Sequence, residues 1–129
     1  MPKPRSYQRQ NILNMNGYVS GEQPDSTGVI KLNTNENPYP PSPAVDATLK
    51  GFDTSRLRRY PSPKAHHFRD CAASVHHIHR NNIIATRGGD ELLRLLLTTF
   101  VNPGDCIGMT DPTYSLYPVL AAIHDSRCK

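Results

Sequence analysis

The sequence has no tryptophan, only three cysteines and no long apolar run, and each shortage excludes a class of protein. An odd cysteine number without a CxxC pair argues against a disulfide framework and favours a reducing, cytoplasmic setting. No run reaches about 18 consecutive apolar residues, so we expect no membrane span, and no apolar segment typical of a secretory signal follows Met1. The net charge of +4 is mild, so we expect no nucleic-acid partner.

The 129 residues divide into two unlike halves. Residues 1–64 hold nine of the twelve prolines, and nine Lys/Arg against five Asp/Glu, whereas the two charge signs balance in residues 65–129. The first half is also poor in large apolar side chains, so it can bury little surface by itself. We therefore predict an extended N-terminal arm over residues 1–28, with a short helix near Arg9–Met15, followed by one partial domain over residues 29–129.

Proline and serine mark two helix starts in the middle of the chain. Ser42 followed by Pro43 is typical of an N-cap and a first helical position, and Gly51 is a suitable end. The pair Ser62-Pro63 predicts a second start of the same kind. The residues expected to face inward are Val45 and Leu49 in the first helix and Phe68, Ala72 and Val75 in the second, since these spacings follow one helical face.

The second half alternates between strand and helix patterns. Strands are predicted at residues 83–85 and 105–110, and a further short strand at residues 29–32. Residues 90–101 read as a leucine-rich, buried helix, residues 114–123 as a last helix, and another strand is expected where the chain ends. This order is typical of a parallel α/β sheet. Because two strands do not complete such a sheet, we expect part of a larger domain.

Three short segments carry groups suited to binding. Residues 86–91, between a strand and a helix, offer glycines and first-turn N–H groups that could face a phosphate; a tight turn capped by Asp90 is the alternative. Residues 111–117 place aromatic rings at a strand's carboxyl end, where a ring could stack on a flat ligand, unless Tyr114 and Tyr117 are simply half-buried. Residues 32–39 are rich in amides and fit either a polar ligand or an exposed turn.

A histidine-rich group is the fourth candidate. His67 and Cys71 are four residues apart, and His76 and His79 three apart, which is compatible with a zinc site on one helix face. Paired cysteines, an HExxH motif and a matching acidic ligand are all missing from the sequence. We expect no metal centre, and a His/Cys metal-binding module remains only an alternative. The full group is His66, His67, Cys71, His76, His77 and His79.

Taken together, four phrases resemble the N-terminal part of the pyridoxal-phosphate-dependent aminotransferases of fold type I, class I and II. They occur in the family's order, from about Tyr18 onward, and are residues 31–38 (KLNTNENP), 59–61 (RYP), 87–92 (RGGDEL) and 111–117 (DPTYSLY). The closest resemblance within the family is to the branch that transfers an amino group between glutamate and imidazole-acetol phosphate in histidine biosynthesis. The resemblance implies an α/β fold, an incomplete large domain preceded by the arm, pyridoxal 5'-phosphate as cofactor and a homodimer.

The resemblance also implies a role for individual residues. Residues 88–91 (Gly88, Gly89, Asp90 and Glu91) would surround the cofactor phosphate, with backbone N–H groups of Gly89 and Asp90 donating to it. Tyr114 would stack on the pyridine ring, and Tyr60 would reach the cofactor phosphate of the neighbouring subunit. The arm's Tyr18 would extend across the dimer toward the substrate phosphate. Asn33, Asn35 and Glu36 would line the substrate side, with Asn35 near the substrate carboxylate.

Several parts of the family pattern have no counterpart in this chain. The Schiff-base lysine lies in the family within a Ser-x-x-Lys-type segment far downstream, and none of Lys3, Lys31, Lys50, Lys64 and Lys129 stands in that context. The Asp partner of the pyridine nitrogen and the Arg for the substrate carboxylate are absent as well. We therefore expect a chain truncated before the cofactor lysine and inactive alone. The alternatives are a non-catalytic phosphate-binding or dimerisation fragment, or another class I/II aminotransferase.

Overall fold

The computed structural model describes residues 7–26 and 28–129, so residues 1–6 and 27 of the predicted arm lie outside the described part. The chain divides into two compact units. One unit joins the arm up to Ser20 with Thr86–Lys129, and the other is Gly21–Ala85. No helix in the described ranges is long and apolar enough to cross a membrane.

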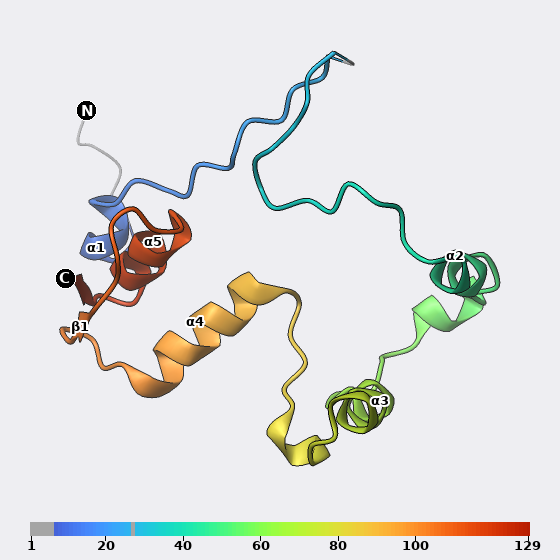
Figure 1. Ribbon diagram of the computed structural model, residues 1–129. Helices are drawn as coiled ribbons and strands as arrows, with labels where there is room; N and C mark the ends of the chain where they lie inside the picture. The colour runs from blue at the N-terminus through green and yellow to red at the C-terminus, as the bar shows by residue number, and fades with distance from the viewer. Residues whose placement is uncertain (1–6, 27) are drawn as a thin grey trace. The chain divides into compact units, whose positions relative to one another are not determined.

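The first unit is built around its last helix, α5. Its elements are α1 (Gln10–Leu13), α4 (Gly89–Phe100), β1 (Cys106–Ile107), α5 (Leu116–Ile123) and β2 (Arg127–Cys128). The strands β1 and β2 pair in parallel, with Cys106 opposite Arg127, and α5 is the crossover between them. The buried residues of the described chain, Leu116, Leu120 and Ala121, all belong to α5, which packs on α1, α4 and β2. Figure 1 shows α1 beside α5.

The second unit consists of short helices joined by extended segments. They are α2 (Pro43–Lys50), the 3-10 helices η1 (Thr54–Arg58) and η2 (Arg80–Asn82), and α3 (His66–His76). Helix α2 has the predicted Ser42 N-cap, Pro43 start and Gly51 end. Helix α3 starts at His66, three residues later than the proline pattern predicts, because the left-handed Ala65 precedes it. Arg69 then ties α3 to η2 by donating to the Arg80 carbonyl at 2.7 Å.

Three strand predictions require correction. Residues 29–32 and 83–85 form no strand in the described chain, and the predicted strand 105–110 shortens to Cys106–Ile107. Short β-rich runs become strands only beside a partner, and in the described residues β2 offers a pairing of only two residues. The α/β alternation itself is confirmed on a small scale by the β1–α5–β2 crossover, including the strand expected at the chain's end.

The predicted burial of apolar helix faces is also wrong. Helix α4 has no buried residue, and Phe100 is 77% exposed. The last helix starts at Leu116 rather than at Tyr114. The predicted inward residues of α2 and α3, Val45, Leu49, Phe68 and Val75, are exposed. The periodicity correctly identifies the helices, but burial needs a covering layer, and α4 is covered mainly along its contact with α5.

Candidate functional site

The loop before α4 has the backbone geometry of a close-approach turn. Gly88, the N-cap, has φ 85° and ψ 176°, a conformation that residues with a Cβ rarely adopt. A Cβ built at Gly88 or Gly89 would meet no atom within 4 Å, so the outer side of the turn is open. The Thr86 hydroxyl donates to the Gly88 carbonyl at 2.9 Å and closes the turn. The loop thus combines a fixed backbone with free space above it.

Glu91 faces back into this loop rather than toward the open side. Its carboxylate accepts from the Arg87 backbone N–H and, at 3.1 Å, from the Arg87 guanidinium. Hydrogen bonds from the Arg87 backbone and side chain hold the pKa of Glu91 below its ordinary value. Because the first-turn N–H groups of a helix have no intrahelical acceptor, they remain available to an anion. Glu91 therefore supports the loop, and the first-turn N–H groups are left without an intrahelical acceptor.

Tyr114 joins this loop to the arm. Its hydroxyl is 3.4 Å from Asp90 Oδ1 and 3.5 Å from the Tyr18 hydroxyl. Its ring meets Tyr18 edge-on at a centroid distance of 6.2 Å and Tyr117 edge-on at 5.7 Å. Hydrogen bonding to Tyr18, desolvation and the charge of Asp90 raise the pKa of Tyr114 to about 12. The Tyr114 phenol therefore stays protonated at neutral pH.

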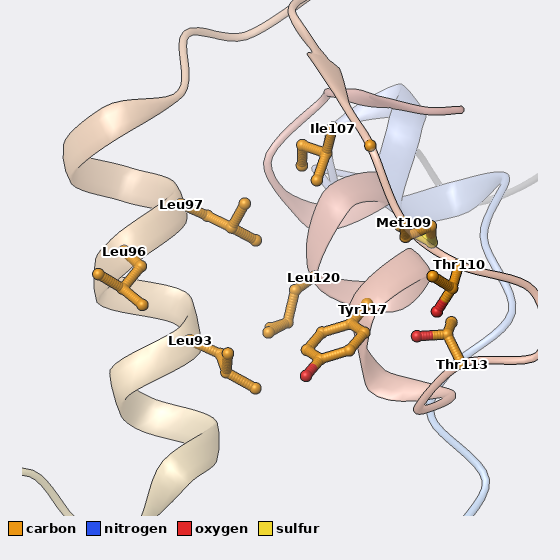
Figure 2. A pocket seen from close by; sticks show the side chains of 10 residues that line it. Leu93, Leu96, Leu97, Ile107, Met109, Thr110, Thr113, Tyr117 and Leu120 are labelled. Carbon is orange, nitrogen blue, oxygen red and sulfur yellow. The ribbon is translucent and has the colours of Figure 1, made fainter.

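An apolar pocket of about 400 Å³ lies beside the aromatic cluster. Figure 2 shows leucines of α4 facing Tyr117 and Leu120 of α5. The polar side chains at its border are Thr110 and Thr113. The leucine-rich sequence of α4 predicted a buried helix, but the pocket depends on the distance between two helices and was not predicted. Its lining includes Leu93, Leu96, Leu97, Ile107, Met109, Thr110, Thr113, Tyr117 and Leu120.

In the second unit, most of the amide-rich motif is occupied by its own neighbours. The Asn33 amide donates to the Glu22 carbonyl at 2.9 Å. Glu36 forms an ion pair with Lys31 and accepts from the Thr34 hydroxyl, and both interactions hold the pKa of Glu36 below its ordinary value. Asn33 and Glu36 therefore hold the loop together in this structure.

The same loop presents Asn35 from a strained backbone. Thr34 and Asn35 have φ values of 64° and 52°, a left-handed conformation that is uncommon for a β-branched residue such as Thr34. Gly21 allows this path, because a Cβ there would lie 2.9 Å from Thr34 Cγ2. Among the described residues, the Asn35 side chain has no hydrogen-bond partner. Of the three predicted substrate-side residues, Asn35 is the one whose side chain remains available to a ligand.

The other predicted residues belong to the Gly21–Ala85 unit. Tyr60 is fully exposed in the Gly21–Ala85 unit, beside a groove that also includes Phe52 and Arg56. Its predicted contact to a neighbouring subunit stays a prediction. In the histidine-rich group, Cys71 Sγ lies 3.9 Å from His67 Nδ1. Within residues 7–26 and 28–129, no three His, Cys, Asp or Glu side chains are grouped so that they could hold a metal.

Sequence reasoning missed the residues that support these features. Gly21 and Lys31 hold the 33–36 loop, and Arg9 and Asn11 bond to the end of α5. The Arg9 and Asn11 contacts join residues more than 110 positions apart and the Gly21 contact depends on a close backbone approach, whereas the Lys31 contacts are short-range but need a particular loop conformation.

Comparison with known proteins gives consistent matches. Residues 27–129 match the model of the family "Aminotransferase class I and II". The histidinol-phosphate aminotransferase of Rippkaea orientalis is 44% identical over 90% of this chain and 33% of its own length. Those of Synechocystis and Clostridium botulinum are 38% and 41% identical, over 92% and 86% of this chain. The chain spans about a third of the length of the curated relatives it matches.

Proposed function

The chain belongs to the class I and II aminotransferase family, and we propose that it forms the N-terminal part of a histidinol-phosphate aminotransferase. The reaction would transfer an amino group between glutamate and imidazole-acetol phosphate in histidine biosynthesis. The observation that carries the proposal is the loop at the start of α4, with Gly88 at φ 85° and Tyr114 held beside Asp90. The names of the similar proteins support the choice of substrate.

The residues of this loop fit pyridoxal 5'-phosphate. The N–H groups of Gly89 and Asp90 would donate to its phosphate, with Gly88 allowing the close approach, and the Tyr114 ring would stack on the pyridine. Pyridoxal phosphate supplies an electron sink for the amino-transfer chemistry. Glu91 keeps Arg87 and the turn in place. In the homodimer that we propose, Tyr60 would contact the cofactor phosphate of the neighbouring subunit.

The substrate contacts form the second part of the proposal. Asn35, with its unpaired amide, would contact the substrate near its carboxylate, while Asn33 and Glu36 shape the loop that presents it. Tyr18 would serve the substrate phosphate. The Tyr18 hydroxyl lies 3.5 Å from the Tyr114 hydroxyl of the same chain, so this structure brings the arm to the proposed cofactor ring within one subunit and not across the dimer as the resemblance implied.

Binding can be tested directly on the 129-residue chain. Titration with pyridoxal phosphate should shift the amide NMR signals of Gly89 and Asp90 saturably. Pyridoxal, which lacks the phosphate, is the matched control and should leave these signals in place. Equal shifts with both compounds, or none with either, would contradict the proposed phosphate site.

Activity provides a separate test. The chain's lysines lack the family context of the cofactor lysine, and Lys31 and Lys50 are paired with Glu36 and Asp46. We expect the purified chain to show no transamination above free pyridoxal phosphate. Turnover well above that background would disprove this expectation.

A second candidate function is a non-catalytic phosphate-binding or dimerisation module. The observation that favours it is the loop at Gly88, whose left-handed backbone and open outer side suit a phosphate without requiring a lysine. One experiment distinguishes the two functions. If the first is right, adding the part of an aminotransferase that carries the cofactor lysine should restore transamination; the second function does not require this.

A further inference from the structure

The arm follows α5 from its last turn to the residues just before its first. At the carboxyl end, Arg9 Nη2 donates to the Ile123 carbonyl at 2.7 Å and Asn11 Nδ2 donates to the Ala122 carbonyl at 2.8 Å. At the opposite end, Tyr18 meets Tyr114, which lies two residues before α5. Figure 1 shows α1, which contains Asn11, packed beside α5. The arm is therefore attached at both ends of one helix.

The lengths of the two segments agree. The eight residues of α5 span about 12 Å at roughly 1.5 Å per residue. The four residue steps from Asn14 to Tyr18 reach at most about 13 Å at roughly 3.3 Å per residue. Between the attachments, residues 14–17 and the α5 residues Pro118, Val119 and Ala122 line a groove of about 520 Å³. Attachment at Asn11 consequently determines where Tyr18 can reach.

The carboxyl end of α5 takes its hydrogen-bond donors partly from the backbone that follows it and partly from the arm. The Ala121 and Ala122 carbonyls accept from backbone N–H groups of Ser126 and Asp125 at 2.9 and 3.1 Å, whereas among the described residues the Ile123 carbonyl accepts only from arm side chains. The last carbonyls of a helix lack intrahelical partners, and cations and N–H donors are favourable there. The last turn of α5 has no basic residue of its own. The Arg9 guanidinium and the Asn11 amide supply the arm's donors from more than 110 positions away in the sequence.

We propose that Arg9 and Asn11 are positioning residues that hold Tyr18 edge-on against Tyr114 and so fix the orientation of the Tyr114 ring. The proposal rests on the proposed function only for what the Tyr114 ring does, namely stack on the cofactor. The anchor itself is a property of the cofactor-free chain. Neither residue is assigned a contact with substrate or cofactor.

The test compares two Asn-to-Asp changes in the cofactor-free chain. In Asn11→Asp the donating amide becomes a carboxylate facing carbonyls at a helix carboxyl end, which is unfavourable. The cross-peak between the rings of Tyr18 and Tyr114 in a neutral-pH NOE spectrum should be lost. With the Tyr18 contact gone, the pKa of Tyr114 should fall, so that its phenolate fraction at pH 11 rises several-fold.

Asn14→Asp is the matched control. The Asn14 side-chain oxygen accepts from Gln10 within the arm, and an aspartate keeps that acceptor. This variant should retain the ring cross-peak and the high pKa of Tyr114. Arg9→Met, which keeps the aliphatic stem without the donors, should weaken the cross-peak as Asn11→Asp does.

Two further measurements separate the possible outcomes. Tyr18→Phe reports the titration of Tyr114 without the second hydroxyl while keeping the anchor, and far-UV circular dichroism shows whether each variant keeps its helices. An unchanged cross-peak and an unchanged Tyr114 titration in Asn11→Asp and Arg9→Met would overturn the proposal. Loss of helix in Asn11→Asp together with an unchanged cross-peak in a folded Arg9→Met would overturn it as well. These experiments contain no pyridoxal phosphate, so their results do not test the proposed function, and failure of one proposal does not imply failure of the other.

Discussion

Adjacent glycines at the start of α4 differ in what they require. Gly88 needs φ 85°, whereas Gly89 opens the helix, and a Cβ at either position meets no neighbour within 4 Å. Gly88→Ala should lower the free energy of unfolding by about 1–3 kcal/mol through backbone strain alone. If the loop moves to relieve this strain, phosphate binding should weaken instead. Gly89→Ala should be neutral or stabilising by up to about 1 kcal/mol, since alanine favours helix. Urea unfolding followed by circular dichroism measures both, and equal destabilisation would contradict the strain argument.

Glu91 makes the same loop sensitive to acid. Its pKa is lowered from 4.5 by the Arg87 backbone and side chain, so the folded state favours the carboxylate. A lowered pKa contributes stability that is present above pH 4.5 and is lost as the pH falls through the lower folded value. We expect the Arg87 amide NMR signal to move over this acidic range.

The control for this prediction is Glu91→Gln. The amide side chain does not titrate between pH 5 and pH 2, so the pH-dependent movement of the Arg87 signal should disappear in this variant. An identical titration of that signal in both proteins would show that another group is responsible.

At the residue level, the sequence predicts the candidate site only where neighbouring residues in the chain determine the local structure. The glycines and Asp90 before a leucine-rich run indicate a helix start with open N–H groups, and the structure has both. The sequence could not show that Asn33 and Glu36 are occupied while Asn35 is not. That distinction depends on the approach of Gly21 to Thr34 and on the Lys31 ion pair. The first is a contact between segments and the second depends on the conformation of the loop between Lys31 and Glu36, and residue types alone specify neither.

At the scale of elements, the first unit has its core on α5, so shortening a leucine side chain should lower its stability by different amounts at buried and exposed positions. Leu120 is 3% exposed and lies between α4 and the arm-side elements, whereas Leu96 on α4 is 44% exposed. Leu120→Ala should cost about 2–5 kcal/mol, because it removes buried methyl groups and leaves a cavity. Leu96→Ala, the same chemical change at an exposed position, should cost much less. Urea unfolding of the two variants under identical conditions measures the difference, and similar losses would argue against α5 as the core.

The contrast between helices and strands has a physical cause. Helix α2 was predicted to the residue because its hydrogen bonds are internal and its ends carry Ser42, Pro43 and Gly51. The segment 29–32 has suitable residues for a strand but no partner in the described chain. Strand formation and helix burial both depend on neighbours, so the sequence identified elements more reliably than their surroundings.

At the scale of the whole molecule, exposed apolar surface is the dominant feature. Large apolar side chains in both units are exposed, among them Ile30, Leu32, Phe68 and Phe100. Within each unit, large apolar side chains left in solvent are available for further packing. The relatives are about three times as long as this chain. Their additional residues are the candidates for covering the corresponding surface in those proteins.

The last prediction follows from the apolar pocket between α4 and α5, where Leu93 and Leu97 are only half-buried. Mixing this chain with the unmatched two thirds of the Rippkaea orientalis relative should cover Leu93 and Leu97, lower the fluorescence of a bound apolar dye and produce transamination. Leu93→Asp should prevent both effects, since it places a charge in the apolar pocket. Thr99→Asp, on the same helix but outside the pocket lining, should allow both. Activity in the mixture that is unaffected by Leu93→Asp would show that the pocket is not the docking surface, and a mixture without activity would favour the non-catalytic module.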